Sequence, residues 1–250
     1  MSRDTIWKHI LQQIAFNPQV PIHIITSSQI KACKSTWTGP ANQFEPRLLC
    51  KMDTSSSRPT VFQENNLCLL SIKNGTYALL GRNIYVSLPK FEMLPQKINK
   101  SHSSLILDIG QSETSMLDNL LHNKVLDTVI REPVLYGPLL GGRHRCSFTT
   151  ELDGHTLQIQ GSQYETDGCY ETENYVRLVE AKSVPCVDFN IRQLYYPFRE
   201  VHKKVGDTKQ IIALFIYIDK QKIIHIHKYK WGDYQKMMDI YHLNYYCFST

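Results

Sequence analysis

Several features of membrane, secreted and zinc-binding proteins are missing from this chain of 250 residues. No apolar run approaches the roughly 20 residues that a helix needs to cross a bilayer. The first stretch, MSRDTIWKHILQQIAF, is amphipathic and lacks the apolar core of a secretory signal. The seven cysteines are an odd number without a Cys-x-x-Cys pair, and their spacing matches no zinc-binding pattern. We therefore expect a cytoplasmic protein with reduced thiols.

Acidic residues are scarce in the first part of the chain. Residues 1–100 contain 12 Lys and Arg against 5 Asp and Glu, whereas residues 101–250 contain 16 against 18. A basic region next to a near-neutral one is typical of a protein that contacts a polyanion, most often nucleic acid. A basic surface without a polyanionic partner is the alternative, and charge alone does not separate the two.

The first 88 residues show the pattern of three helices followed by a β-hairpin. Apolar side chains recur with helical spacing over residues 3–16, and Thr26-Ser27-Ser28 can cap a second helix. Glu45-Pro46 can open a third helix, because proline in the first turn loses no hydrogen bond. Residues 66–80 predict a hairpin, since Asn-Gly between two apolar runs favours a type I′ turn.

Three helices and a hairpin form the order of a winged helix, which contacts DNA bases with its third helix and the phosphate backbone with its wing. We expect Lys51, Arg58 and Lys73 to contact phosphates in such a module. A small α+β packing domain without a DNA-binding role is the alternative. The polar, proline-broken residues 89–104 predict a linker after this module.

Residues 105–250 alternate between helical and strand-like patterns. Ser112 is expected to cap a helix, and YVRLVEAK, residues 175–182, is expected to be a central strand. A helix in DFNIRQLYYPF, two strands, a helix in GDYQKMMDIYH and a terminal strand should follow. This order predicts an α/β fold with a mixed sheet.

Glu180 and Lys182 close the predicted central strand and share one face of it, because residues two apart on a strand point the same way. A surface ion pair is the simplest interpretation, and it would contribute little to stability. If residues 158–166 paired with the central strand, Asp167 would return beside Glu180. Two carboxylates and a strand carbonyl are oxygen ligands that suit Mg²⁺, and Lys182 would then polarise the attacking water.

The pattern Asp167 … Glu180-Ala181-Lys182 resembles the PD-(D/E)XK motif of the nuclease superfamily that contains most type II restriction endonucleases. The resemblance covers roughly residues 110–250, and the motif alone is short enough to arise by chance. It implies Mg²⁺ bound by Asp167 and Glu180, with Lys182 as a catalytic residue. By the same resemblance, these residues form a PD-(D/E)XK nuclease core.

Two further residues match positions that some members of this superfamily carry. Glu113 corresponds to an extra acid on the first helix, and Gln193 to a polar residue on the helix after the motif strand. The sequence departs from the usual pattern in one respect, because no proline precedes Asp167. Glu165 is therefore a rival for the aspartate position, although Gly168 favours Asp167 by allowing a tight turn.

Other residue groups admit both a functional and a structural interpretation. Arg143 and Arg145 follow the flexible GPLLGG and would either clamp phosphate or form a polar turn. Arg192 and Arg199 would line a basic edge beside the predicted site. His225 and His227 share a strand face without a nearby third ligand, and a solvated face explains them better than a metal site does.

We expect an α/β (α+β) protein of two domains, residues 1–88 (winged helix-like) and 105–250 (catalytic), joined by a linker, residues 89–104. The resemblance implies that it is a type II restriction endonuclease. The resemblance implies Mg²⁺-dependent hydrolysis of double-stranded DNA that leaves 5′-phosphates. A homodimer is expected if the target is palindromic. The alternatives are a non-catalytic winged-helix regulator and a structure-specific repair nuclease.

Overall fold

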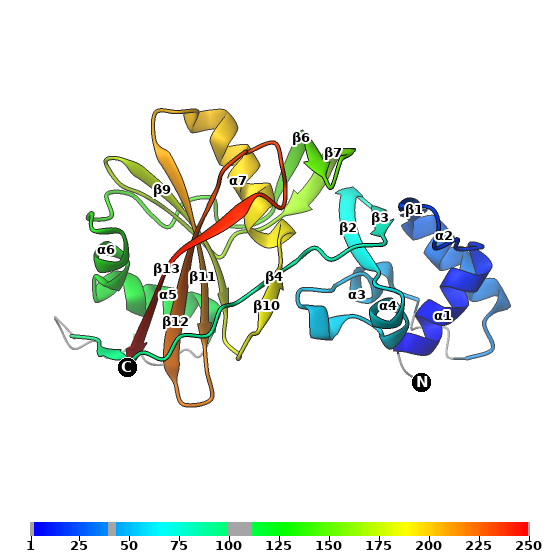
Figure 1. The fold of residues 1–250 in the computed structure, drawn as a ribbon, viewed down its shortest axis with the longest axis horizontal. Coiled ribbons are helices and arrows are strands. Elements are labelled where there is room, and N and C mark those ends of the chain that lie inside the picture. The colour runs from blue at the N-terminus through cyan, green and yellow to red at the C-terminus, as the bar shows by residue number, and fades with distance from the viewer. Residues whose placement is uncertain (1–2, 40–43, 100–111, 250) are drawn as a thin grey trace.

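The computed structural model describes residues 3–39, 44–99 and 112–249, and it has a mixed α/β architecture. Figure 1 shows the arrangement of its helices and strands. In the first 99 residues the elements are α1 (Arg3–Gln13), β1 (Ile22–Thr26), α2 (Ser27–Ala32), the 3₁₀ helix η1 (Cys33–Thr36), α3 (Pro46–Leu49), the 3₁₀ helix η3 (Ser55–Ser57), α4 (Thr60–Glu64), β2 (Cys68–Lys73), β3 (Thr76–Leu80), β4 (Tyr85–Ser87) and β5 (Gln96–Lys97).

The remaining elements follow residue 111. They are α5 (Glu113–His122), α6 (Val125–Ile130), β6 (His144–Leu152), β7 (His155–Tyr164), β8 (Gly168–Glu171), β9 (Tyr175–Lys182), β10 (Asp188–Asn190), α7 (Arg192–Val205), β11 (Gln210–Ile218), β12 (Ile223–Trp231) and β13 (Ile240–Ser249). None of the helices in the described ranges has the length and apolarity that a membrane span requires.

A six-stranded mixed sheet forms the centre of the second part of the chain. Its strand order is β5-β13-β12-β11-β9-β8, and β9 lies parallel to β11. Helix α7 connects these two strands and packs on one face of the sheet, where it contributes Leu194, Tyr195 and Phe198 to the core. Helices α5 and α6 cover the other face, with Leu120 and Val129 in a second cluster. The predicted mixed sheet is therefore confirmed.

A second sheet joins the hairpin of the first part to a hairpin of the second part. Its order is β1-β3-β2-β7-β6, and the junction is a parallel contact in which Lys73 pairs with Gln160. In Figure 1 the β6–β7 hairpin lies between the six-stranded sheet and the helices near the N-terminus. Those helices bury Trp7, Ile10 and Phe62 in a core of their own.

Turn and capping residues in the sequence predicted the positions of several elements correctly. The Asn74-Gly75 turn joins β2 to β3, with Gly75 at a φ of +69°. Thr26 caps α2 through a capping box, and the Ser112 hydroxyl accepts a hydrogen bond from the Ser115 amide at the start of α5. The predicted third helix is only the short α3, and α4 was not predicted.

Two structural expectations were wrong. Residues 232–242 do not form a helix: the segment is a loop that continues into β13, closed by Gly232 N–H to Asp239 O at 3.0 Å and tied to β6 by Met237 N–H to Glu151 O at 3.0 Å. The central strand β9 does not pair with residues 158–166. It pairs with β8 and β11, whereas β7 belongs to the other sheet.

Part of the predicted linker forms a strand that pairs with a strand of residues 112–249. β5 pairs with β13 at the edge of the six-stranded sheet, and the neighbouring β4 pairs with β10. Residues 100–104 of the linker, and residues 105–111 after it, lie outside the described residues.

Candidate active site

The predicted site residues come together at the end of β9, next to the start of its partner strand β8. Asp167 directly precedes β8, and its amide donates to Val179 O at 3.2 Å. Its carboxylate oxygen Oδ2 accepts the Ala181 amide at 2.7 Å, so the side chain continues the hydrogen bonds of the sheet past the last strand pair. Asp167 therefore lies beside Glu180 and Lys182 through β8 rather than through the predicted pairing with β7.

Glu180 and Lys182 form a shielded ion pair. Lys182 Nζ donates to Glu180 Oε1, and the two side chains are only 18% and 9% exposed, respectively. A surface ion pair would leave both groups in water, so that interpretation does not fit. Burial of both charges is costly, and it is tolerated when each charge keeps a partner and further hydrogen bonds.

Gln193 supplies the second hydrogen bond to the buried carboxylate. It lies in the first turn of α7, and its Nε2 donates to Glu180 Oε1 at 2.5 Å. Its other amide atom, Oε1, is buried and has no hydrogen-bond partner among the described residues. A buried acceptor without a partner is unfavourable, so this atom marks a position where a bound water or ligand group would donate.

Glu113 adds a third carboxylate from a different element. It is the first residue of α5, and Ser112 at the N-cap fixes the start of that helix. The negative charge of Glu113 raises the pKa values of both Asp167 and Lys182, so its field reaches the site. Glu113, Asp167, Glu180, Lys182 and Gln193 are thus brought together from separate elements.

The site holds more negative than positive charge. Burial raises the pKa of Glu180 to about 8, the positive charge of Lys182 opposes this shift, and the negative charge of Asp167 adds to it. Burial also raises the pKa of Asp167, against the effects of the Ala181 amide and Lys182. Burial by itself would lower the pKa of Lys182, but Glu180, Asp167 and Glu113 outweigh it and the net shift is upward.

The donor set fits a hard divalent cation. Asp167 and Glu180 offer carboxylate oxygens, and the Ala181 carbonyl faces the same edge of β9 as the Ala181 amide that Asp167 binds, because N–H and C=O of one strand residue share an edge. Oxygen ligands of this kind suit Mg²⁺, which keeps water in its other positions. Within the described ranges, no three His, Cys, Asp or Glu side chains form a ready-made metal site. The main-chain carbonyl would therefore have to complete the set.

Glu165, the rival for the aspartate position, lies on the surface. Its side chain is 57% exposed and pairs with Arg143 Nε at 2.7 Å. Arg145 on β6 is exposed as well. Arg143 and Arg145 thus lie just outside the site, on the open end of the β6–β7 hairpin.

Arg192 and Arg199 are engaged within the protein. Arg192 Nη2 donates to Gln163 O at 2.6 Å, and its guanidinium lies 5.4 Å from the centroid of the Tyr196 ring. Arg199 is buried, donates to Thr149 O at 2.9 Å and lies over the Phe148 ring. These contacts give Arg199 a structural role, which corrects its predicted contact with DNA.

The three phosphate contacts predicted in residues 1–88 also divide into exposed side chains and one that is hydrogen-bonded within the protein. Lys73 is exposed at the end of β2, and Lys51 is 71% exposed and lies 3.5 Å from the Asp53 carboxylate. Arg58 instead donates to Ser55 O and Leu67 O, at 3.2 and 3.1 Å. Its guanidinium is therefore engaged within the fold, and the expected phosphate contact at Arg58 stays a prediction.

The remaining metal candidates, His225 and His227, do not lie on the solvated strand face that was expected. His227 is fully buried, and burial lowers its pKa to about 3. It bonds His242 at 3.2 Å, whereas His225 lies between Asp219 and the Tyr245 hydroxyl. All seven cysteines are free thiols.

A segment from the first part of the chain borders the site, and sequence patterns did not indicate it. Asp53 O accepts the Asn190 amide at 2.8 Å, and Asp188 accepts the Ser55 amide at 2.8 Å and its hydroxyl. The negative charge of Asp53 also raises the pKa of Glu180. These residues are more than 130 positions apart in the chain, so no local motif could have paired them.

Comparison with protein families divides the chain into two matched regions. Residues 81–249 match a family described as Domain of unknown function (DUF6997). The chain belongs to the DUF6997 family. Residues 4–79 match a second family, Domain of unknown function (DUF6996), and the boundary between the two lies at the end of β3. Neither the curated proteins nor the solved structures give a match to this DUF6997 chain.

Proposed function

We propose that this DUF6997 protein is a Mg²⁺-dependent DNA endonuclease of the PD-(D/E)XK type, acting as a type II restriction enzyme. The observation that carries the proposal is the convergence of Asp167, Glu180 and Lys182 at the end of β9, with Gln193 hydrogen-bonded to Glu180. A shielded lysine beside two carboxylates is costly for stability and is typical of a catalytic site.

Each side chain has a role in this reaction. Asp167, Glu180 and the Ala181 carbonyl would hold Mg²⁺, which when bound would supply positive charge to the scissile phosphate. Lys182 orients the attacking water and stabilises negative charge that develops on the phosphate. Gln193 fixes the rotamer of Glu180, and its free Oε1 accepts a hydrogen bond from water. The water oxygen bonds to phosphorus, the bond from phosphorus to the 3′ oxygen breaks, and that oxygen leaves as a 3′-hydroxyl while the 5′ end keeps the phosphate.

The first 88 residues serve as a winged helix-like DNA-binding part in this proposal. Support comes from the order of α1, α2 and the β2–β3 hairpin, to which β1 adds a third strand, and from Lys73 at the hairpin turn. Residues 89–104 link it to a catalytic nuclease core, residues 105–250. A homodimer would match a palindromic target.

Incubation of supercoiled plasmid with the full-length protein and Mg²⁺ tests the proposal. Discrete linear fragments that require Mg²⁺ are the expected result. A smear would indicate cutting without sequence preference, as by a nuclease that acts on DNA structure. Intact plasmid under all conditions, together with DNA binding, would contradict catalysis and favour a regulator. The Lys182→Ala variant, purified in parallel, excludes a contaminating nuclease.

A further inference from the structure

The outward face of the β6–β7 hairpin is polar and carries little acidic charge. Inward side chains alternate with outward ones, and Phe148 and Ile159 lie in the core. Glu151 is the one acidic residue in the two strands. The exposed residues on the outward face are Arg145, Ser147, Thr149 and Glu151 on β6, and Thr156, Gln158, Gln160 and Gln163 on β7.

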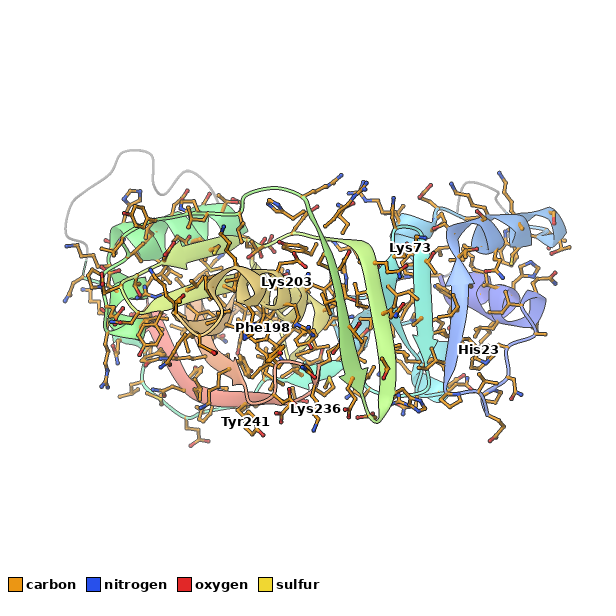
Figure 2. The ribbon with its side chains drawn as sticks, turned by 90° about the horizontal axis from the view of Figure 1, so that it is seen from above. His23, Lys73, Phe198, Lys203, Lys236 and Tyr241 are labelled. Atoms are coloured by element: carbon orange, nitrogen blue, oxygen red, sulfur yellow. The ribbon has the colours of Figure 1, made fainter. Side chains whose placement is uncertain are left out.

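This face extends from the candidate active site to the β2–β3 hairpin. β7 ends at Tyr164, three residues before Asp167, so its open end adjoins the site. Near its middle, Gln160 pairs with Lys73 of β2, which places Lys73 beside Gln160 on the sheet. Figure 2 shows the strands of this sheet side by side, with Lys73 next to the β6–β7 hairpin.

A β-bulge aligns the glutamines along the hairpin. Gly161 has a φ of +61°, its amide donates to the Ser147 hydroxyl at 2.9 Å, and the register with β6 shifts at this point. The bulge adds one residue to β7, so Gln160 and Gln163 are both exposed although they are three positions apart. Without it, the period of two would place them on opposite faces.

The free edge of the hairpin is closed to a further strand. Arg199 donates to Thr149 O, and Lys203 Nζ donates to Ser147 O, both from α7. Glu200 accepts the Ser147 amide at 3.2 Å. Main-chain groups on the outer edge of β6 are therefore occupied, and a partner has to engage the outward face rather than add a strand.

We propose that the outward face of the β6–β7 hairpin enters the major groove of duplex DNA and contacts base edges through Gln158, Gln160 and Arg145. The inference rests on the proposed action on DNA and assigns the surface that determines sequence preference. A two-stranded ribbon fits the major groove, where a Gln amide pairs with adenine and an Arg guanidinium with guanine. Lys73 and Arg143 flank the amides and complement the phosphates on either side.

The test is selection from a pool of duplexes with a randomised centre, bound by the full-length protein in Ca²⁺ so that cleavage does not interfere. The wild-type protein should enrich one sequence. The Gln158→Ala/Gln160→Ala variant should lose the preference at one or two base pairs and bind the enriched duplex about 10-fold or more weaker. Its affinity for unselected duplex should stay the same, because phosphate contacts are unchanged.

A matched control is Gln19→Ala/Gln221→Ala, which removes two exposed amides elsewhere on the surface and should leave the enriched sequence unchanged. An unchanged preference in the Gln158→Ala/Gln160→Ala variant, or a wild-type protein that enriches no sequence, would overturn the inference. Because binding is measured, the outcome is separate from catalysis. A protein that selects a sequence through these glutamines but never cuts would refute the nuclease proposal alone. A protein that cuts at the same fixed sequence with and without Gln158 and Gln160 would refute this inference alone.

Discussion

Gln193 and Lys182 donate to the same oxygen atom of Glu180, one from the first turn of α7 and the other from the end of β9. This arrangement locks the buried carboxylate between a helix and a strand. It also fixes the direction of the free Gln193 Oε1, which has no partner among the described residues. A buried acceptor left unpaired costs about 1–3 kcal/mol, and such a cost is tolerated at a site that a ligand or water fills during function.

The Lys182→Ala variant should lose cleavage but keep DNA binding. Loss of one electrostatic catalytic group lowers the rate on the order of 100-fold or more. Both carboxylates remain, so Mg²⁺ should still bind. Plasmid cleavage rates and a gel-shift titration measure the two properties. Lys209→Ala is the matched control, because Lys209 pairs with Glu171 at the other end of β8, at 2.6 Å. Normal cleavage by Lys182→Ala would show that the Glu180–Lys182 pair has a structural role and no catalytic one.

Replacement of either carboxylate, as Asp167→Asn or Glu180→Gln, should raise the Mg²⁺ concentration needed for half-maximal cleavage and slow the reaction. Asp167→Asn removes a carboxylate that repels phosphate when ionised, so DNA binding in a chelator should tighten. Glu180→Gln should have this effect only above about pH 8, where the metal-free Glu180 carboxyl is ionised. A Mg²⁺ titration of cleavage and a metal-free binding assay test the two effects. Glu165→Gln is the control, since this exposed carboxylate pairs with Arg143 outside the cluster. If Glu165→Gln alone were defective, Glu165 would be the metal ligand.

The stability of the metal-free protein should fall as pH rises between about 4 and 8. Burial raises the pKa of Glu180 to about 8, so the folded protein holds a proton that the unfolded chain has released. The raised pKa of Lys182 stabilises the fold below its ordinary value of about 10.4 and adds no slope in this range.

Chemical denaturation in a chelator across this range measures the effect. Glu180→Gln should flatten the dependence and leave the contribution of Asp167, whose pKa is also raised by burial. Added Mg²⁺ should reverse the slope, because it binds the ionised carboxylates. Equal slopes in wild-type and Glu180→Gln protein would show that Glu180 ionises normally.

Arg58→Ala should lower the stability of the protein, whereas Lys73→Ala should change its DNA binding. Arg58 satisfies the carbonyls of Ser55 and Leu67, so its loss should lower the free energy of unfolding by about 1–3 kcal/mol. Lys73→Ala should leave stability unchanged and reduce the salt dependence of DNA binding by about one ion. Denaturation curves and binding at several salt concentrations separate the two. An unchanged salt slope in Lys73→Ala would argue against DNA contact at the β2–β3 turn.

Removal of residues 1–88 should destabilise the rest of the chain. The deletion uncovers the edge of β7 and removes β4 from β10, together with Leu70 and Ile84 from the shared core. We expect residues 89–250 to be poorly soluble or to unfold at lower denaturant concentration than the full chain. A truncated chain as stable as the full one would establish an independent catalytic domain.

Local patterns in the sequence determined the features that depend on neighbouring residues. The Asn74-Gly75 turn, the Ser112 cap and the placement of Glu180 and Lys182 at the end of a strand follow from backbone preferences and the period of a strand. These preferences act over a few residues, so they persist in almost any tertiary context.

The tertiary structure decided the features that depend on distant partners. Asp167 reaches Ala181 through β8, and residues 232–239 form a loop because Glu151 of β6 binds their backbone. Arg58 and Arg199 are basic in the sequence, yet main-chain carbonyls of the protein, Leu67 O and Thr149 O, bind their guanidinium groups. A guanidinium can donate to a carbonyl or to a phosphate, so the folded environment determines which of them it meets.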